Sequence, residues 1–168
     1  MTSIADLFSV KGRVAVITGA ATGIGFWMAE AWVENGGKDE LDRIVAEVSR
    51  HESSLDVLVN NAGLPEYNAY EPPAPMPMTY DQESWVQQFK LHTWSHGALT
   101  AAFVPLLTNA AMAGDGRGSV ILVGSVSGDI WNPIAMQDGY ATTKAGNHML
   151  GKLLAAKLVN VGIRVNVV

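Results

Sequence analysis

The segment from residue 13 to residue 25, which reads RVAVITGAATGIG, constrains the fold more than any other part of the chain. An apolar, β-branched run from Val14 to Ile17 comes directly before three glycines, and an amphipathic stretch from Ile24 to Asn35 follows them. This order predicts a strand, a tight turn and a helix. Glycines in such a turn let the backbone approach a pyrophosphate, and a helix N-terminus supplies free N–H groups with a partial positive charge. A strand-to-helix turn without a ligand would use the same residues, so the other motifs must decide between the two interpretations.

A tyrosine and a lysine lie four residues apart in the sequence YATTK. On a helix, this spacing places Tyr140 and Lys144 on one face, one turn apart. A phenol titrates near pH ~10, so a neighbouring ammonium is needed to make it a usable acid or base at neutral pH. Ser125 lies upstream and would hydrogen-bond a carbonyl or alcohol oxygen of a substrate. The pair alone also fits an ordinary helix surface, but together with the glycine turn it indicates hydride-transfer chemistry.

These motifs resemble those of the short-chain dehydrogenase/reductase (SDR) family, and they are nearest to fungal and bacterial members related to 3-oxoacyl reductases. TGAATGIG at residues 18–25 matches the TGxxxGxG turn of the family, and NNAG at residues 60–63 matches the signature after its fourth strand. Ser125, Tyr140 and Lys144 match its catalytic positions. The resemblance implies an α/β fold with a Rossmann-like, doubly wound parallel sheet in three layers (α/β/α). It also implies an NAD(P)-dependent oxidoreductase that reduces a carbonyl or oxidises a secondary alcohol, with Tyr140 as the acid or base.

The resemblance also implies which residues contact the cofactor. Lys144 would hold the nicotinamide ribose in addition to acting on Tyr140. The full set of implied cofactor residues is Thr18, Gly19, Thr22, Gly23, Ile24, Gly25, Asn60, Ala62, Gly63, Tyr140 and Lys144. The residues that select NAD or NADP lie at the end of the second strand of the family. That strand has no counterpart here, so both cofactors stay open.

Two positions depart from the family pattern. The family holds a relay water with an asparagine seven residues after a tryptophan, and counting from Trp85 leads to His92. An imidazole also hydrogen-bonds water and titrates near neutral pH, so His92 is either part of the relay or an ordinary packed helix residue. Ser125 lies slightly further before Tyr140 than the family serine does, which leaves Ser127 as the alternative.

The chain is also shorter than the family pattern. The first helix is followed by Gly36 and Gly37 and then by a helical pattern that leads directly into LDVLVNNAG, so the second strand, the next helix and the third strand of the family have no counterpart. The sequence ends at Val168, at the start of the sixth strand. We therefore expect a reduced sheet, with strand order 1-4-5-6 in the numbering of the family, in a single partial domain over residues 1–168. The alternative function is a catalytically inactive remnant or isoform that retains at most a nucleotide-binding or subunit-interaction surface.

Composition excludes several other classes of function. The net charge is -5 and no Lys/Arg cluster is present, which argues against nucleic acid as a partner. There is no cysteine for a disulfide or a thiolate metal site. His92 and His96 are four residues apart and could bridge a metal, but no carboxylate follows them in the manner of a metalloprotease, so we expect no metal. The expected partner is a small carbonyl or alcohol compound.

The location and the assembly of the protein are expectations of the same kind. The N-terminus lacks the pattern of a targeting segment, and the apolar stretch from Ala98 to Leu107 is too short to span a membrane, so we expect no membrane and a cytoplasmic protein. The resemblance implies a homo-oligomer. Its interface would use Trp94, Phe103 and Leu106, and each of these also suits the core of the chain.

Overall fold

Four parallel strands form one sheet in a computed structural model that describes residues 10, 12–19, 41–64, 81–130 and 138–168. In sheet order, the strands are β1 (Ala15–Ile17), β2 (Val57–Asn60), β3 (Ser119–Leu122) and β4 (Arg164–Val167). Their register pairs Val16 with Leu58, Leu58 with Val120, and Val120 with Val165. The α/β class and the strand order expected from the sequence are both confirmed.

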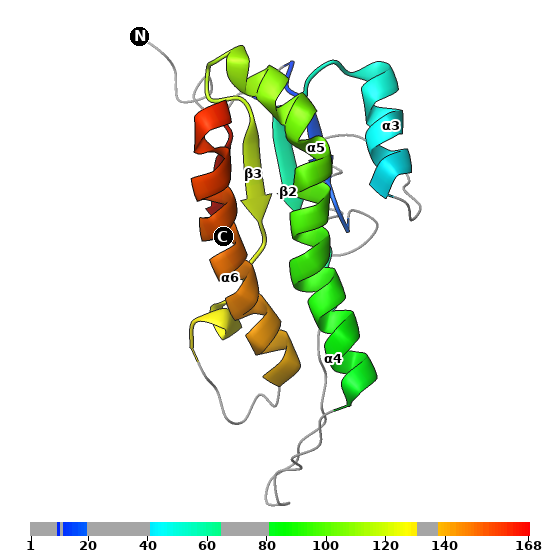
Figure 1. Cartoon of the computed structure of the whole chain (residues 1–168), viewed down its shortest axis with the longest axis vertical. Coiled ribbons are helices and arrows are strands. Elements are labelled where there is room, and N and C mark those ends of the chain that lie inside the picture. Colours follow the sequence, from blue (N-terminus) through cyan, green and yellow to red (C-terminus); the bar gives the residue numbers. More distant parts are fainter. Residues whose placement is uncertain (1–9, 11, 20–40, 65–80, 131–137) are drawn as a thin grey trace, which may run out of the picture.

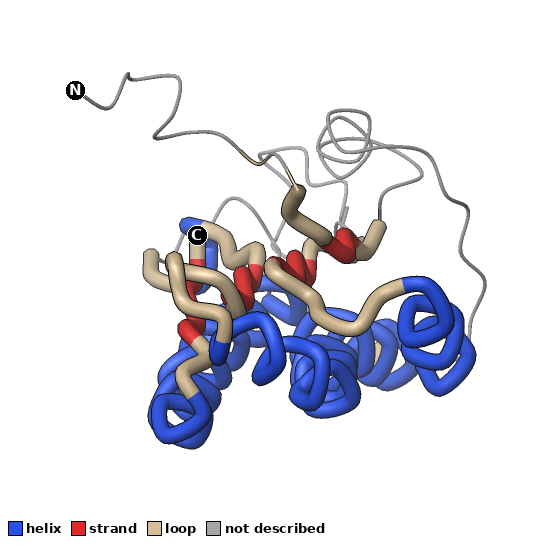
Figure 2. Tube along the Cα trace, turned by 90° about the horizontal axis from the view of Figure 1, so that it is seen from above, coloured by secondary structure: helices blue, strands red, loops and turns tan. Residues whose placement is uncertain are grey.

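The described helices lie on one face of this sheet (Figures 1 and 2). They are α3 (Leu41–His51), α4 (Gln82–Phe89), the π-helix η1 (Lys90–Trp94), α5 (Ser95–Met112) and α6 (Asp138–Leu158), with short 3-10 turns η2 (Val126–Gly128) and η3 (Val159–Val161). The order of the strands in the sheet is also their order in the chain, so each connection leads to the neighbouring strand on the same side. Because such connections are right-handed, the described helices all lie on the same face of the sheet. The helix expected over residues 24–35 lies outside the described residues.

The core lies between the sheet and α5. Successive side chains of a strand point to opposite faces, so one set from each strand meets the helices. The buried cluster contains Leu55, Leu58, Leu99, Phe103, Leu106, Leu107, Val120, Leu122 and Ile163. Phe103 and Leu106 are therefore core residues, whereas Trp94 is 59% exposed. The expected homo-oligomer stays a prediction.

The long helix expected from residue 82 to about residue 107 is present but interrupted. It begins after Asp81, whose carboxylate accepts the N–H of Ser84 at 2.7 Å, and it continues to Met112. Within η1 the N–H of Ser95 donates to the carbonyl of Lys90, five residues back. This wider turn contains His92 and was not predicted from the sequence. Such turns occur frequently at functional sites.

Charged side chains connect the strands at the amino edge of the sheet. Asp56 is 1% exposed, and its carboxylate accepts the N–H of Val14 at 2.7 Å and an N–H of Arg117 at 3.0 Å. Arg13 lies 4.0 Å from the same carboxylate and forms a second ion pair with Asp115 at 2.7 Å. None of the helices in the described ranges is long and apolar enough to cross a membrane.

Candidate active site at the carboxyl edge of the sheet

The described site residues gather at the carboxyl edge of the sheet, where doubly wound folds bind their ligands. Thr18 and Gly19 follow β1, the loop of residues 60–63 begins at the end of β2, and Ser125 follows β3. Gly124, the residue before Ser125, donates its N–H to the carbonyl of Val168 at 2.7 Å. The ends of all four strands therefore contribute to one edge.

The turn after β1 is held against the loop after β2. The Thr18 hydroxyl accepts the N–H groups of Asn61 at 3.0 Å and Ala62 at 2.9 Å, and the Thr18 carbonyl accepts the Asn61 side-chain amide at 3.0 Å. Gly19 has a φ of +69°, and an added Cβ would lie only 2.9 Å from the Cα of Ala62. A side chain at position 19 would therefore be strained and would force the two loops apart. The sequence did not single out Asn61, because its partner lies 43 residues away on another strand.

Asn60 has an internal contact. Its side chain is fully buried and its amide donates to the hydroxyl of Thr100 on α5 at 3.1 Å. Its Oδ1 atom has no hydrogen-bond partner among the described residues. Asn60 therefore connects the loop to α5, and its expected contact with a cofactor stays a prediction. Thr22, Gly23, Ile24 and Gly25 lie outside the described residues, so the phosphate turn stays a prediction as well.

Tyr140 and Lys144 lie together on α6, as the sequence predicted from their spacing. The Nζ atom of Lys144 is 5.6 Å from the centre of the Tyr140 ring. Lys144 is 3% exposed, and its ammonium donates to the carbonyl of Val123 at 2.7 Å. Burial lowers the pKa of Lys144 from 10.5 to about 8. The structure thus holds a buried ammonium beside a half-buried phenol.

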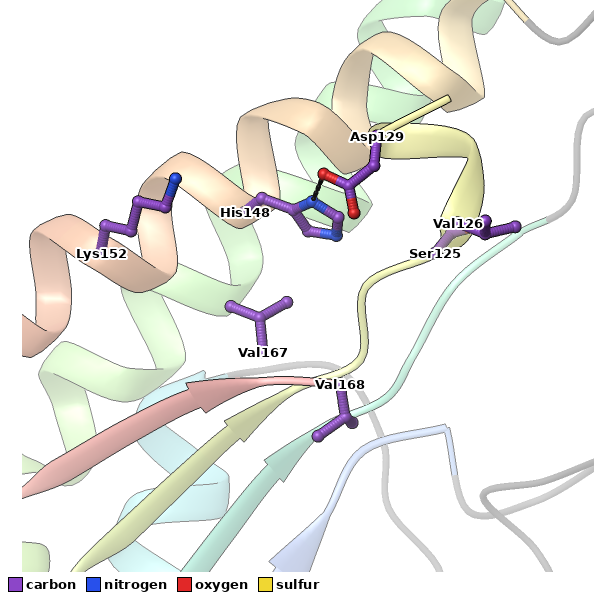
Figure 3. A pocket seen from close by; sticks show the side chains of 7 residues that line it. All are labelled: Ser125, Val126, Asp129, His148, Lys152, Val167 and Val168. Atoms are coloured by element: carbon purple, nitrogen blue, oxygen red, sulfur yellow. Dashed lines mark hydrogen bonds and ion pairs between the residues drawn. The ribbon is translucent and has the colours of Figure 1, made fainter. Parts of the chain in front are cut away.

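Ser125 precedes η2, which packs against α6 next to Lys144. The Ser125 hydroxyl accepts the N–H of Ser127, the alternative serine, at 3.2 Å. An added Cβ on Gly128 would lie 2.8 Å from backbone atoms of Lys144 and Ala145, so the two elements are in close contact. Between η2, α6 and the end of β4 there is a hollow of about 370 Å³ (Figure 3). Its lining includes Ser125 and a hydrogen bond from Nδ1 of His148 to the carboxylate of Asp129 at 3.0 Å.

His92 is fully buried and both of its ring nitrogens contact protein groups. Nε2 accepts the N–H of Leu64 at 2.9 Å, so the proton of the neutral ring is on Nδ1, which donates to the Thr143 hydroxyl at 3.1 Å. That hydroxyl donates to the carbonyl of Tyr140 at 2.8 Å. The ring also meets the Tyr140 ring edge-on, with centroids 5.2 Å apart. His92 therefore connects the loop after β2 to the turn of α6 that carries Tyr140.

The environment of His92 keeps its ring neutral. Burial, reinforced by the positive charge of Lys144, lowers the pKa of His92 from 6.5 to about 4. A relay through this side chain would have to break one of its two hydrogen bonds. The proton-relay role of His92 stays a prediction.

Known proteins resemble the chain along almost all of its length. An oxidoreductase of Schizosaccharomyces pombe, described as uncharacterised, is 30% identical over 185 residues, with 95% of this chain and 66% of the relative covered. A rhamnolipids biosynthesis 3-oxoacyl-[acyl-carrier-protein] reductase of Pseudomonas aeruginosa is 28% identical over 195 residues, with 96% and 73% covered. Among solved structures, the Pseudomonas aeruginosa RhlG/NADP active-site complex superposes with a TM-score of 0.79 at 27% identity, over 95% of this chain and 72% of that chain.

The chain spans only part of these relatives, and the alignments contain internal gaps. It covers 66% of the yeast protein and 73% of the bacterial one. Since 95% of 168 residues is about 160, the 185 aligned positions include about 25 without a counterpart in this chain. Gaps of this kind agree with the strands that we expected to be missing.

A family model described as short chain dehydrogenase matches residues 37–168, which is more than three quarters of the chain. This range contains the loop after β2, Ser125, Tyr140 and Lys144. The chain therefore belongs to the short-chain dehydrogenase family.

Proposed function

We propose that this chain is an NAD(P)-dependent oxidoreductase that reduces a carbonyl group or oxidises a secondary alcohol by hydride transfer. The observation that carries this proposal is the buried ammonium of Lys144, 5.6 Å from the Tyr140 ring at the carboxyl edge of the sheet. A buried lysine with a lowered pKa beside a phenol is typical of an active site. The similarity to the RhlG/NADP complex supports the same class of cofactor.

The described residues fit a nicotinamide nucleotide. Gly19 lets the turn after β1 pack directly against the loop after β2, so the backbone of both segments lies at the carboxyl edge where doubly wound folds bind nucleotides. An ammonium has three protons, and the described residues supply one acceptor for Lys144, the carbonyl of Val123. Ribose hydroxyl groups are suitable acceptors for the others. Lys144 would hold the ribose, and Thr18, Ala62 and Gly63 would line the same edge.

The nicotinamide would supply the hydride in reduction or accept it in oxidation. In reduction, Tyr140 donates its phenolic proton to the carbonyl oxygen as the carbon gains the hydride, so that an alcohol forms and the phenolate takes a proton from solvent. In oxidation, Tyr140 removes the hydroxyl proton. Lys144 stabilises the negative charge on the phenol oxygen in both directions. Ser125 hydrogen-bonds the reacting oxygen and orients it toward Tyr140.

Cofactor binding is the first test. Purified chain is titrated with NADH and with NADPH while nicotinamide fluorescence and the thermal midpoint are followed. We expect saturable binding of at least one of them with a raised midpoint, since a ligand that binds only the folded state stabilises it. If neither binds, the proposal fails and the inactive remnant is the better description.

Turnover is the second test. A panel of ketones and secondary alcohols is assayed with the cofactor that binds. The Tyr140→Phe variant keeps the ring and loses the proton donor, so it should bind cofactor like the wild type and lose turnover by about 100-fold or more. Equal turnover in the variant would remove Tyr140 from its assigned role.

A further inference from the structure

A second buried polar pair joins α5 to α6, one helical turn beyond the pair formed by His92 and Thr143. It consists of His96 and Asn147, which are 1% and 0% exposed. The Nδ1 atom of His96 lies 3.2 Å from the Oδ1 atom of Asn147. Neither residue belongs to the catalytic or cofactor set described above.

The pair has a contact at each end. The Nε2 atom of His96 is 3.3 Å from the carbonyl of Ala62, in the loop after β2. The amide of Asn147 donates at 3.3 Å to the carbonyl of Val123, the same oxygen that accepts the ammonium of Lys144 at 2.7 Å. Val123 is two residues before Ser125. A path of close polar contacts therefore runs from the loop after β2 to the catalytic ammonium and the segment that carries Ser125.

Polar side chains at these two positions need a reason, because apolar residues would fill the same buried space at lower cost. A neutral imidazole has one N–H and can donate to only one of the two oxygens that face His96. Burial lowers the pKa of His96, the bonds from Asn147 and Ala62 raise it, and the charge of Lys144 lowers it further. The titratable groups that face His96 are Lys144 on α6 and His92 in the preceding turn.

We propose that His96 and Asn147 are positioning residues for Lys144, because His96 fixes the side chain of Asn147, which holds the Val123 carbonyl and with it the ammonium and the Ser125 segment. The proposal rests on the proposed function of Tyr140 and Lys144 and adds two buried residues that lie outside the catalytic and cofactor set. The two side chains act through a backbone carbonyl that they share with the lysine.

Two variants of His96 separate the two ends of the path. His96→Asn keeps an amide donor near the position of Nδ1 and so preserves the contact with Asn147. His96→Gln places its amide near the position of Nε2 and preserves the contact with Ala62 instead. We expect kcat and its pH profile to stay near wild type in His96→Asn. In His96→Gln and in Asn147→Leu, kcat should fall about tenfold and the pH profile should shift, as expected for a misplaced catalytic group.

A double variant separates positioning from folding. His96→Leu combined with Asn147→Leu removes both polar groups and keeps the space filled, which is close to neutral for stability. It should keep its thermal midpoint and still lose kcat about tenfold. Wild-type kcat and an unchanged pH profile in the double variant would overturn the proposal, as would equal losses in His96→Asn and His96→Gln.

A measurement that needs no turnover tests the electrostatic coupling. The chain has four histidines, so the ring nitrogen signals of His96 can be assigned by NMR and titrated with pH. Lys144→Met removes a positive charge and should raise the pKa of His96, whereas Lys152→Met, an exposed lysine two turns further along α6, should leave it unchanged. An unchanged pKa in Lys144→Met would overturn the coupling. If no substrate is turned over at all, the proposed function fails and this titration still decides the placement of His96.

Discussion

At the scale of single residues, the ammonium of Lys144 is a charge held in the interior of the protein. Burying a charge is costly even when it is hydrogen-bonded, and Lys144 is 3% exposed with one described acceptor, the Val123 carbonyl. A buried lysine with a lowered pKa is typical of a functional site. Lys144 should therefore be a residue that reduces stability and supports activity.

Replacing Lys144 by methionine tests whether this residue lowers stability while it supports activity. The pKa is 10.5 in the unfolded chain and about 8 in the folded one, so between these values the unfolded chain keeps a proton that the folded chain has lost. The wild type therefore gains stability as pH rises through this window, and at pH 7 it bears the full cost. Lys144→Met should have the higher thermal midpoint at pH 7, and its advantage should shrink toward pH 10.

The control for this measurement is Lys152→Met, which removes an exposed lysine from the same helix and should change the midpoint little. Turnover should fall in Lys144→Met only. A midpoint below wild type at pH 7 would show that the bond to Val123 outweighs the cost of burial, and would contradict the argument.

At the scale of elements, the site depends on how closely η2 packs against α6. Gly128→Ala would place a methyl group 2.8 Å from the backbone of Lys144 and Ala145, where no side chain can move aside. The η2 turn would shift and carry Ser125 with it. We expect a lower thermal midpoint and a loss of about 100-fold in kcat, the effect of displacing a catalytic group by about 1 Å.

Gly146→Ala is the matched control, because it adds the same methyl group to α6. There the nearest atoms belong to the side chain of Thr93, at 3.6 Å and beyond, which is ordinary contact. Alanine also favours a helix interior over glycine by about 1 kcal/mol. The midpoint of Gly146→Ala should therefore equal or exceed that of wild type. A Gly128→Ala variant as active as Gly146→Ala would show that the position of η2 does not matter.

What the sequence could predict at this scale depends on how local each signal is. Tyr140 and Lys144 are four residues apart on one helix, so their spacing alone places them together, and the β-branched runs mark the strands. The contact of His92 with Thr143 spans 51 residues and depends on the packing of two helices. The π-turn of η1 adds one residue to a helix whose periodicity looks continuous, and no local pattern indicates it.

At the scale of the whole molecule, the two edges of the sheet have different tasks. The carboxyl edge collects the residues proposed for catalysis, whereas the amino edge carries a buried carboxylate, Asp56, that connects β1, β2 and the loop before β3. Parallel strands make this division possible, because all their carboxyl ends lie at one edge. Changes at the amino edge should therefore affect stability without affecting the affinity of the folded chain for cofactor.

Asp56→Asn tests this division of tasks. The N–H of Val14 and the guanidinium of Arg117 approach different oxygens of the carboxylate, so an asparagine in the same position would turn its NH2 group toward one of these donors, and it carries no charge to pair with Arg117 or Arg13. Breaking a buried ion pair from one side costs about 3 kcal/mol or more, a large share of the stability of a small domain. Urea unfolding should show this loss of stability. The control is Asp115→Asn, because the side chain of Asp115, which also pairs with Arg13, is 80% exposed. This control should cost less than about 1 kcal/mol of stability. The folded fraction of Asp56→Asn should bind the cofactor of the wild type with unchanged affinity. Weaker binding at full folding would show that the two edges are coupled through the strands, contrary to the division argued here.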